Sequence, residues 1–236
     1  MKLGIIGAMD VEVETLKEKL AKKTERTIAG SVYCEGILEG LPVVVVKCGI
    51  GKVNAALCVQ ALCDCFGVTH VVNTGVAGSL DAKLDIGDFV ISQDAVYHDF
   101  DVHILSDNYP VGQVPGLDVW AFPADKMMMD LAFSAANTLC PGHAHIGTVA
   151  SGDQFVCQKE HKKTIVANTK GICTEMEGAA IAHGAWKNGI PFVVIRAISD
   201  KADDSAEMDY PTFEAIAAKR CAEVTQMMAK YLAQNT

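Results

Sequence analysis

Short apolar segments that alternate with helical segments constrain the fold of this chain more than any other feature. Leu3 to Ala8 predicts a buried strand, and Asp10 to Leu20 places apolar residues at helical spacing. The same order recurs, with strands expected at 69–73, 88–97, 143–150, 171–175 and 191–199 and helices at 52–66, 125–139, 158–168, 177–188 and 211–233. Strands separated by helices predict an α/β fold with a largely parallel, helix-covered sheet.

Two stretches depart from this alternation. Thr27 to Leu38 and Pro42 to Cys48, joined by a turn at Glu39 and Gly40, predict an antiparallel meander. Residues 98–123 are rich in Gly, Pro, Asn and Asp without clear periodicity, which predicts a long loop of a functional or interfacial kind. With 236 residues, half of them hydrophobic, the chain is expected to form a single domain over 1–236.

Composition excludes several classes of partner. The formal net charge is −9 and no Lys/Arg run exceeds two residues, so we expect no binding to nucleic acid. No apolar stretch approaches the roughly 18 residues of a membrane span, so no membrane partner is expected. The nine cysteines are odd in number and lack a framework spacing, which predicts reduced thiols in a cytoplasmic protein.

Common cofactor and metal motifs are incomplete in this sequence. The segment "CGIGKV" at 48–53 lacks the first glycine and the hydroxyl residue of a phosphate-binding loop. Gly4 and Gly7 do not complete a dinucleotide fingerprint, and neither Cys63-x-Cys65 nor His143-x-His145 has a second half with zinc spacing. Ser151 lies in "ASGD", which is not a nucleophile elbow. We therefore expect no cofactor and no metal.

Polar residues follow four of the expected strands. These stretches are Met9–Glu12, Asn73–Gly78, Glu175–Glu177 and Arg196–Asp200. Ligands of open α/β sheets bind beyond the carboxyl ends of the strands, where loops supply polar groups without disrupting the core. The sequence therefore predicts that these four stretches converge on one site.

Each polar residue also has a purely structural explanation. Glu12 could be an ordinary helix glutamate, Glu177 a helix cap, and Asp200 a cap or turn residue. The glycines of "NTGVAGSL" could form a tight turn or admit a flat ligand close to the backbone. Arg196 is harder to explain, because a buried guanidinium demands acceptors, which Glu177 or Asp200 could supply.

Seven segments taken together carry a family resemblance. They are "GIIGAMDVEVETL", "GIGKVNAA", "VVNTGVAGSL", "VYHDFDV", "SGDQFV", "TEMEGAAIAH" and "PFVVIRAISDKAD". In this order, from residue 3 to about 220, the chain resembles the 5′-methylthioadenosine/S-adenosylhomocysteine nucleosidases of the purine nucleoside phosphorylase superfamily. The resemblance implies a three-layer α/β/α domain, a central mixed and partly barrel-like sheet, and a homodimer.

The resemblance also implies an activity. Such enzymes hydrolyse the N-glycosidic bond of methylthioadenosine and adenosylhomocysteine without a cofactor, releasing adenine and a 5′-thioribose in methionine salvage. It assigns Asp200 as the acid that protonates adenine, with a pKa raised by burial, and Glu12 as the base that activates water. The resemblance also implies Met176 and Glu177 at the ribose, Phe155 and Val156 at adenine, Arg196 holding Glu177 or water, and Ser199 orienting Asp200. Further implied substrate-binding residues are Val76, Ala77, Gly78 and Glu175.

For the 5′ tail, the resemblance implies a pocket shared between subunits. Ile50 of one subunit would meet Val102, Leu105 and Pro115 of the other. Two features depart from the family pattern: Val76 stands where a serine is usual, and the loop after Asp101 is slightly longer.

Alternative functions follow from the same residues. Aminodeoxyfutalosine, with a bulkier 5′ substituent, is an additional or preferred candidate substrate. A nucleoside phosphorylase would need cations for phosphate, whereas the loop after the first strand offers Asp10, Glu12 and Glu14. A catalytically silent nucleoside-binding protein would not require both Glu12 and Asp200, and a dinucleotide enzyme lacks its glycine pattern.

Overall fold

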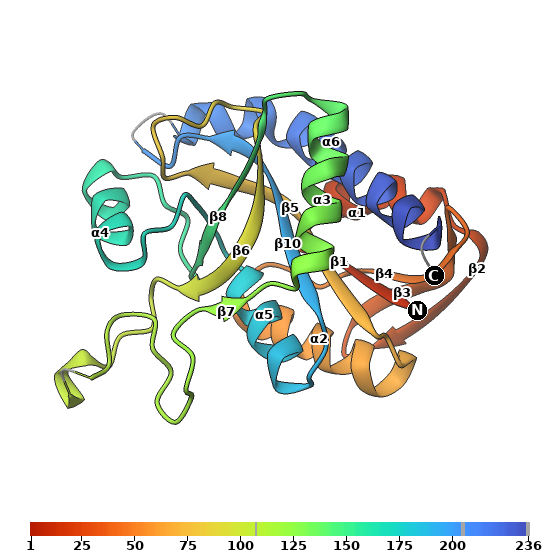
Figure 1. The fold of residues 1–236 in the computed structure, drawn as a ribbon, viewed down its shortest axis with the longest axis horizontal. Helices are drawn as coiled ribbons and strands as arrows, with labels where there is room; N and C mark the ends of the chain where they lie inside the picture. Colours follow the sequence, from red (N-terminus) through yellow and green to blue (C-terminus); the bar gives the residue numbers. More distant parts are fainter. Residues whose placement is uncertain (107, 204–205, 235–236) are drawn as a thin grey trace.

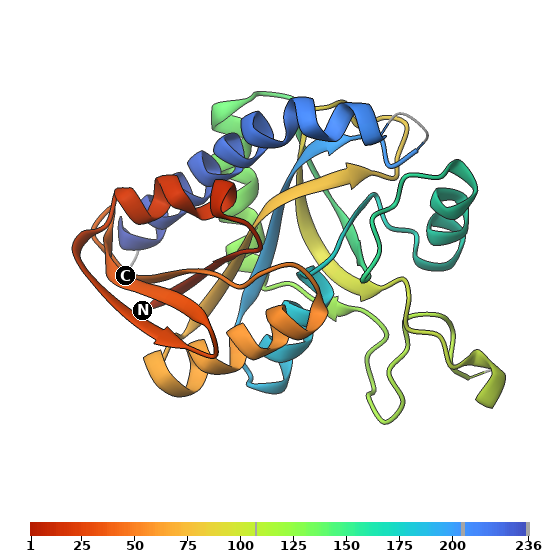
Figure 2. The same cartoon turned by 180° about the vertical axis from the view of Figure 1, so that it is seen from behind.

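A computed structural model describes residues 1–106, 108–203 and 206–234 of the chain. Among these residues, ten strands form one mixed sheet, with helices on both of its sides (Figures 1 and 2). The strands are β1 (Leu3–Gly7), β2 (Ala21–Ile28), β3 (Ser31–Leu38), β4 (Leu41–Lys47), β5 (His70–Ser79), β6 (Phe89–Tyr97), β7 (Phe122–Pro123), β8 (Ala144–Ser151), β9 (Cys173–Glu175) and β10 (Phe192–Asp200). The helices are α1 (Asp10–Glu18), α2 (Lys52–Phe66), the 3₁₀ helix η1 (His103–Leu105), α3 (Lys126–Leu139), α4 (Lys159–Thr169), α5 (Gly178–Lys187) and α6 (Ala206–Gln234).

One part of the sheet closes on itself. Neighbouring strands follow the order β10, β6, β8, β9 and β5, and β5 then pairs with β10 to complete a ring. Strands β1, β4, β3 and β2 continue outward from β5. The expected mixed, partly barrel-like sheet is therefore confirmed.

Two apolar layers enclose the sheet. Along β4, the side chains of Val43 and Val45 join the core that packs under α1, α3 and α6. Val44 and Val46 point to the opposite face and join the core under α2 and α5. All four are fully buried, because both faces of this sheet are covered. Continuous apolar runs are the sequence signature of such doubly covered strands.

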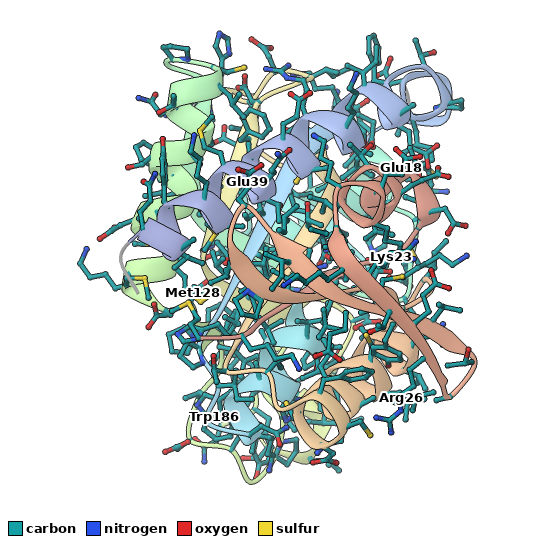
Figure 3. All side chains as sticks on the ribbon, turned by 90° about the vertical axis from the view of Figure 1, so that its right-hand side faces the viewer. Glu18, Lys23, Arg26, Glu39, Met128 and Trp186 are labelled. Carbon is teal, nitrogen blue, oxygen red and sulfur yellow. The ribbon has the colours of Figure 1, made fainter. Side chains whose placement is uncertain are left out.

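The meander differs from its prediction. Thr27 to Leu38 is not one strand, because Ala29 and Gly30 form a turn with positive φ angles of 48° and 81°. The turn pairs β3 with a preceding strand, β2, whose residues are almost all exposed. Figure 3 faces this edge strand, on which Lys23 and Arg26 are labelled. The sequence pattern does not predict β2, because a strand exposed on both faces has no apolar alternation.

Strand β5 is longer than predicted. The expected strand ended at Asn73, but β5 runs on through the glycine-rich segment to Ser79. β10 lies alongside in parallel, with Arg196 opposite Gly75 and Asp200 opposite Gly78. The glycines therefore lie within a strand of the ring and do not form a tight turn.

Two further boundaries differ from the sequence expectations. Helix α6 begins at Ala206 and includes Pro211, whereas the expected helix began at about residue 211. The long loop from His98 contains the short helix η1 and ends in β7, which pairs with β6. Figure 1 shows the loop projecting from the body at the lower left. None of the helices in the described ranges is long and apolar enough to cross a membrane.

Candidate active site

A cavity of about 560 Å³, part of it open to solvent, lies near the last residues of β1, β9 and β10 and the second half of β5. It therefore collects side chains from all four polar stretches that the sequence singled out. The predicted site residues that line it are Glu12, Ile50, Val76, Ala77, Gly78, Phe155, Val156, Glu175, Met176, Glu177, Ser199 and Asp200.

Glu12 is buried in the first turn of α1. One carboxylate oxygen, Oε2, accepts hydrogen bonds from the backbone N–H groups of Ala8 (2.6 Å) and Met9 (3.0 Å). The other, Oε1, accepts one from the N–H of Val76 on β5 (3.1 Å). Burial raises the pKa of Glu12, while Arg196 and these backbone donors act in the opposite direction. Glu12 thus caps its helix and also presents a carboxyl group to the cavity.

Gly75 is required where Glu12 and Arg196 come together. A Cβ atom at this position would overlap Oε1 of Glu12 and Nη1 of Arg196. Gly78 plays the same part for Asp200, because a Cβ there would come within 2.7 Å of Oδ1. These glycines make room for charged side chains of the site, a reason that the sequence analysis did not consider.

Arg196 lies behind the cavity and is fully buried. Its Nη2 donates to Glu175 Oε2 and Asn73 Oδ1, and it is 3.9 Å from Glu177 Oε2. The predicted partners, Glu177 or Asp200, were therefore wrong as the principal acceptors. Neither Glu175 nor Asn73 was considered as an acceptor, because each lies in a different strand of the ring and only the closed sheet brings them to Arg196.

Glu175 is the anion that balances this guanidinium. Its Oε1 accepts from the hydroxyl of Ser151, and the backbone N–H groups of Glu177 (3.1 Å) and Gly178 (2.8 Å) donate to Oε2. Burial opposes its ionisation, but Arg196 and these donors outweigh burial and hold the pKa of Glu175 below its ordinary value. Glu175 thus lines the cavity with both oxygens already engaged by protein donors.

Glu177 occupies the N-cap position of α5, but its side chain makes no capping hydrogen bond. Its Oε1 instead accepts from the backbone N–H of Gly51 at 2.8 Å. Burial and the neighbouring Glu175 carboxylate raise the pKa of Glu177. The helix-capping explanation is therefore wrong, and the other oxygen of Glu177 remains available to a ligand.

Asp200 ends β10 and is buried. Its Oδ2 accepts from the hydroxyl of Ser199 at 2.9 Å, and its Oδ1 from the N–H of Ala202 at 2.8 Å. Burial raises the pKa of Asp200, and those two hydrogen bonds lower it to a smaller extent. Asp200 therefore stabilises a turn, as one explanation from the sequence held, and its raised pKa also favours a protonated carboxyl group.

Two aromatic rings stand at the mouth of the cavity. Phe155, which is 49% exposed, lies on the segment after β8, and Tyr210 belongs to α6. Their ring centroids are 5.5 Å apart in an edge-to-face arrangement. Five lining residues were not predicted as site residues from the sequence: Tyr210, Ala8, Met9, Gln154 and Thr174. Tyr210 lies outside the seven quoted segments, whereas the other four lie inside them but were given no role.

Besides Arg196, three predicted residues lie outside this cavity. Val102, Leu105 and Pro115 belong to the projecting loop and do not line the site of their own chain. Leu105 is 72% exposed. In the described portion of the chain, no cluster of three or more His, Cys, Asp or Glu side chains is placed to hold a metal ion.

Comparison with known proteins identifies the family. The profile of the phosphorylase superfamily matches residues 2–232. The chain belongs to this superfamily. Within it, the chain belongs to the same family as the 5′-methylthioadenosine/S-adenosylhomocysteine nucleosidase of Halalkalibacterium halodurans, to which it is 42% identical over 214 residues, covering 90% of each chain. The family named from the sequence is thus confirmed.

Solved structures of the superfamily share the fold. The 5′-methylthioadenosine/S-adenosylhomocysteine nucleosidase of S. pneumoniae, bound to the transition-state inhibitor MT-ImmA, aligns with a TM-score of 0.92 and 35% identity, covering 98% of this chain and 100% of that one. The futalosine hydrolase of Helicobacter pylori aligns with a TM-score of 0.92 and 33% identity, covering 98% of both chains.

The Arg196–Glu175 pair yields a stability prediction for this superfamily member. Glu175→Gln keeps the shape of the side chain but leaves a buried guanidinium without its main counter-charge, so the free energy of unfolding should fall by about 3–5 kcal/mol. Urea denaturation measures this change. As a control, Asp130→Asn breaks the exposed Lys126–Asp130 pair and should change stability by less than about 1 kcal/mol. Equal effects of the two substitutions would contradict this role of the buried pair.

Proposed function

We propose that this protein hydrolyses the N-glycosidic bond of 5′-methylthioadenosine and S-adenosylhomocysteine, releasing adenine and the 5′-thioribose sugar. The observation that carries the proposal is the presence of two buried carboxyl groups, Glu12 and Asp200, on the walls of one cavity. The names of the related proteins support the same substrates.

In the proposed reaction, Asp200 is the general acid. Its raised pKa favours the protonated form, and proton transfer to N7 of adenine lets the base leave with the electron pair of the C1′–N9 bond. Water then adds to C1′ of the sugar cation, and its proton passes to the Glu12 carboxylate. An acid and a base acting on opposite sides of the breaking bond resemble the arrangement in inverting glycosidases.

Other lining residues would hold the substrate. The free oxygen of Glu177 accepts hydrogen bonds from the ribose 2′ and 3′ hydroxyls, and Met176 packs on the sugar. Phe155 stacks on adenine, whose edge meets backbone groups of Phe155 and Val156. Ser199 orients Asp200, to which it already donates a hydrogen bond.

The charges of the cavity favour water over phosphate as the nucleophile. Among the described lining residues there is no Lys, Arg or His, whereas Glu12, Glu177 and Asp200 are acidic. The nearby Arg196 is already bonded to Glu175 and Asn73. A phosphate dianion would therefore lack a free cation and would face like charges. This argues against a phosphorylase.

We further propose a cytoplasmic homodimer that functions in methionine salvage. Ile50, 54% exposed at the edge of the cavity, would form the 5′ pocket together with Val102, Leu105 and Pro115 of the partner subunit. Burying apolar groups of the tail there contributes about 0.8 kcal/mol per CH₂. All nine cysteines are free thiols, which fits a reducing compartment.

Aminodeoxyfutalosine remains a second candidate substrate. The H. pylori structural neighbour is named a futalosine hydrolase, and this neighbour aligns over nearly the whole chain. The cavity is partly open, and the exposed Ile50 borders the side proposed for the 5′ tail. The bulkier tail would therefore extend toward the projecting loop of the partner subunit. A panel of the three nucleosides, with adenine release as the readout for the thio-nucleosides and base release for the third, ranks them.

The first functional prediction concerns the nucleophile. In phosphate-free buffer, the purified protein should release adenine from methylthioadenosine, and added phosphate should leave the rate unchanged. A coupled assay for free adenine, with chromatography of the sugar product, measures both. Strict dependence on phosphate, with a sugar 1-phosphate as product, would show a phosphorylase instead.

The second concerns the carboxyl pair. Asp200→Asn and Glu12→Gln should each lower kcat by about a hundredfold or more, because each removes one proton transfer. Circular dichroism and thermal melting show whether each variant remains folded. An active Asp200→Asn enzyme would remove the acid from the mechanism, and an active Glu12→Gln enzyme would remove the base.

The pH dependence follows from the same two groups. Burial raises the pKa of both Glu12 and Asp200. In the proposed reaction Asp200 must be protonated and Glu12 must be ionised. A rise in pH removes the proton of Asp200, and a fall in pH protonates Glu12, so kcat/KM should pass through a maximum. A profile that is flat from acid to alkaline pH would contradict this assignment.

The fourth prediction tests the shared pocket. Light scattering should give about twice the 25.1 kDa mass of one chain. Leu105→Asp should shift the protein toward monomers and raise KM for methylthioadenosine, whereas Ile216→Asp, at another exposed apolar residue, should change neither. A fully active monomer would refute the shared pocket.

A further inference from the structure

A network of charged groups borders the candidate active site. Lys52, the first residue of α2, donates from Nζ to both carboxylate oxygens of Asp99, at 2.7 and 2.6 Å. The same ammonium group lies 3.8 Å from Oδ2 of Asp153. The Lys52 and Asp99 side chains are only 22% and 15% exposed. One cation thus balances two carboxylates from separate segments, one following β6 and one following β8.

Backbone groups complete this network. The N–H of Asp153 donates to Asp99 Oδ2 at 2.8 Å, and the N–H of Lys52 donates to Asp153 Oδ1, also at 2.8 Å. Each carboxylate therefore ties one segment to another. Together these bonds hold the first turn of α2 against the segment that carries Asp153.

The residue next to Lys52 in the chain contacts a carboxyl group that lines the cavity. Gly51, immediately before Lys52, donates its N–H to Oε1 of Glu177 at 2.8 Å. Gly51 has a φ of 98°, and a Cβ atom there would lie 3.1 Å from Oδ1 of Asp153. In this one backbone conformation, Gly51 both donates its N–H to Glu177 and packs closely against the carboxylate of Asp153.

We propose that Lys52 is a positioning residue for the recognition of the ribose hydroxyls. It does not line the cavity. By neutralising Asp99 and Asp153 it holds Gly51 against Oε1 of Glu177, which fixes the carboxylate so that Oε2 faces the sugar. The proposal rests on the hydrolase function given above, and it names how substrate specificity at that same site is maintained.

Removing the cation should release this arrangement. Without Lys52, the carboxylates of Asp99 and Asp153 face one another unbalanced, and like charges in a partly buried place repel. The segment that carries Asp153 would move away from α2, and the N–H of Gly51 would no longer orient Glu177. Phe155 lies two residues further on the same segment, so contact with the base should weaken as well.

The test compares methylthioadenosine with its analogue lacking the ribose 3′ hydroxyl. In the wild-type enzyme, loss of a hydrogen bond to the carboxyl group of Glu177 should lower kcat/KM by about tenfold or more. In Lys52→Met this penalty should shrink to less than about threefold, because Glu177 is no longer held to receive the hydroxyl. KM for methylthioadenosine should rise more than kcat falls.

A second variant and a control keep the test independent of folding. Asp99→Asn retains the shape of the side chain and removes one of the two carboxylate charges, so in the Lys52→Met background it should relieve the repulsion and restore much of the 3′-hydroxyl penalty. Lys2→Met removes a lysine of similar exposure that pairs with Glu35 at 2.6 Å, away from the cavity, and should leave the penalty unchanged. Light scattering reports whether any variant alters assembly.

The outcomes separate the two proposals. A wild-type enzyme that hydrolyses methylthioadenosine without phosphate, together with a 3′-hydroxyl penalty that stays the same in Lys52→Met, would overturn the positioning role alone. A penalty that Asp99→Asn fails to restore in the Lys52→Met background would also overturn it. A uniform loss of kcat for both substrates would also overturn it, since that result indicates only a structural role. A wild-type enzyme that releases no adenine would overturn the proposed function and the positioning role with it.

Discussion

The buried contact between Arg196 and Glu175 is the interaction on which the rest of the site depends. It joins β10 to β9 within the closed part of the sheet, and Arg196 also reaches Asn73 on β5. A guanidinium in this position costs free energy of desolvation, which only a close and well-bonded counter-charge offsets. Glu175 supplies that counter-charge. Arg196 therefore fixes Glu175 without lining the cavity, and its positive charge favours ionisation of the neighbouring Glu12.

Much of this architecture could be predicted from the sequence, because it depends on local apolar patterns. The helix at 52–66 was expected with the bounds that the structure gives, and the buried strands were located to within a few residues. β2 could not be found in this way, because it is an exposed edge strand with polar residues on both faces. The full length of β5 was missed for a different reason: pairing with β10 keeps its glycines extended, and that pairing joins residues more than a hundred positions apart.

The residues of the candidate site also fall into two groups, those that local sequence patterns indicate and those that only tertiary contacts reveal. Glu12, Glu177 and Asp200 could be selected because polar residues at the ends of apolar strands are unusual, and the family resemblance added their roles. The acceptors of Arg196 and the contribution of Tyr210 depend on three-dimensional contacts with no local signal. The hydrogen bond from Gly51 to Glu177 is of the same kind, because it joins residues 126 positions apart in the chain.

The pairing of β10 with β5 has a consequence for the geometry of the site. Asp200 ends β10, while the N–H group of Val76 that binds Glu12 belongs to β5, and the two strands are hydrogen-bonded neighbours. Backbone hydrogen bonds between β10 and β5 therefore fix the position of Asp200 relative to the N–H group that binds Glu12. The ring cannot open like a hinge without breaking its backbone hydrogen bonds. Phe155 and Tyr210 lie outside the ring, on the segment after β8 and on α6, so this constraint does not extend to the two aromatic rings that line the cavity.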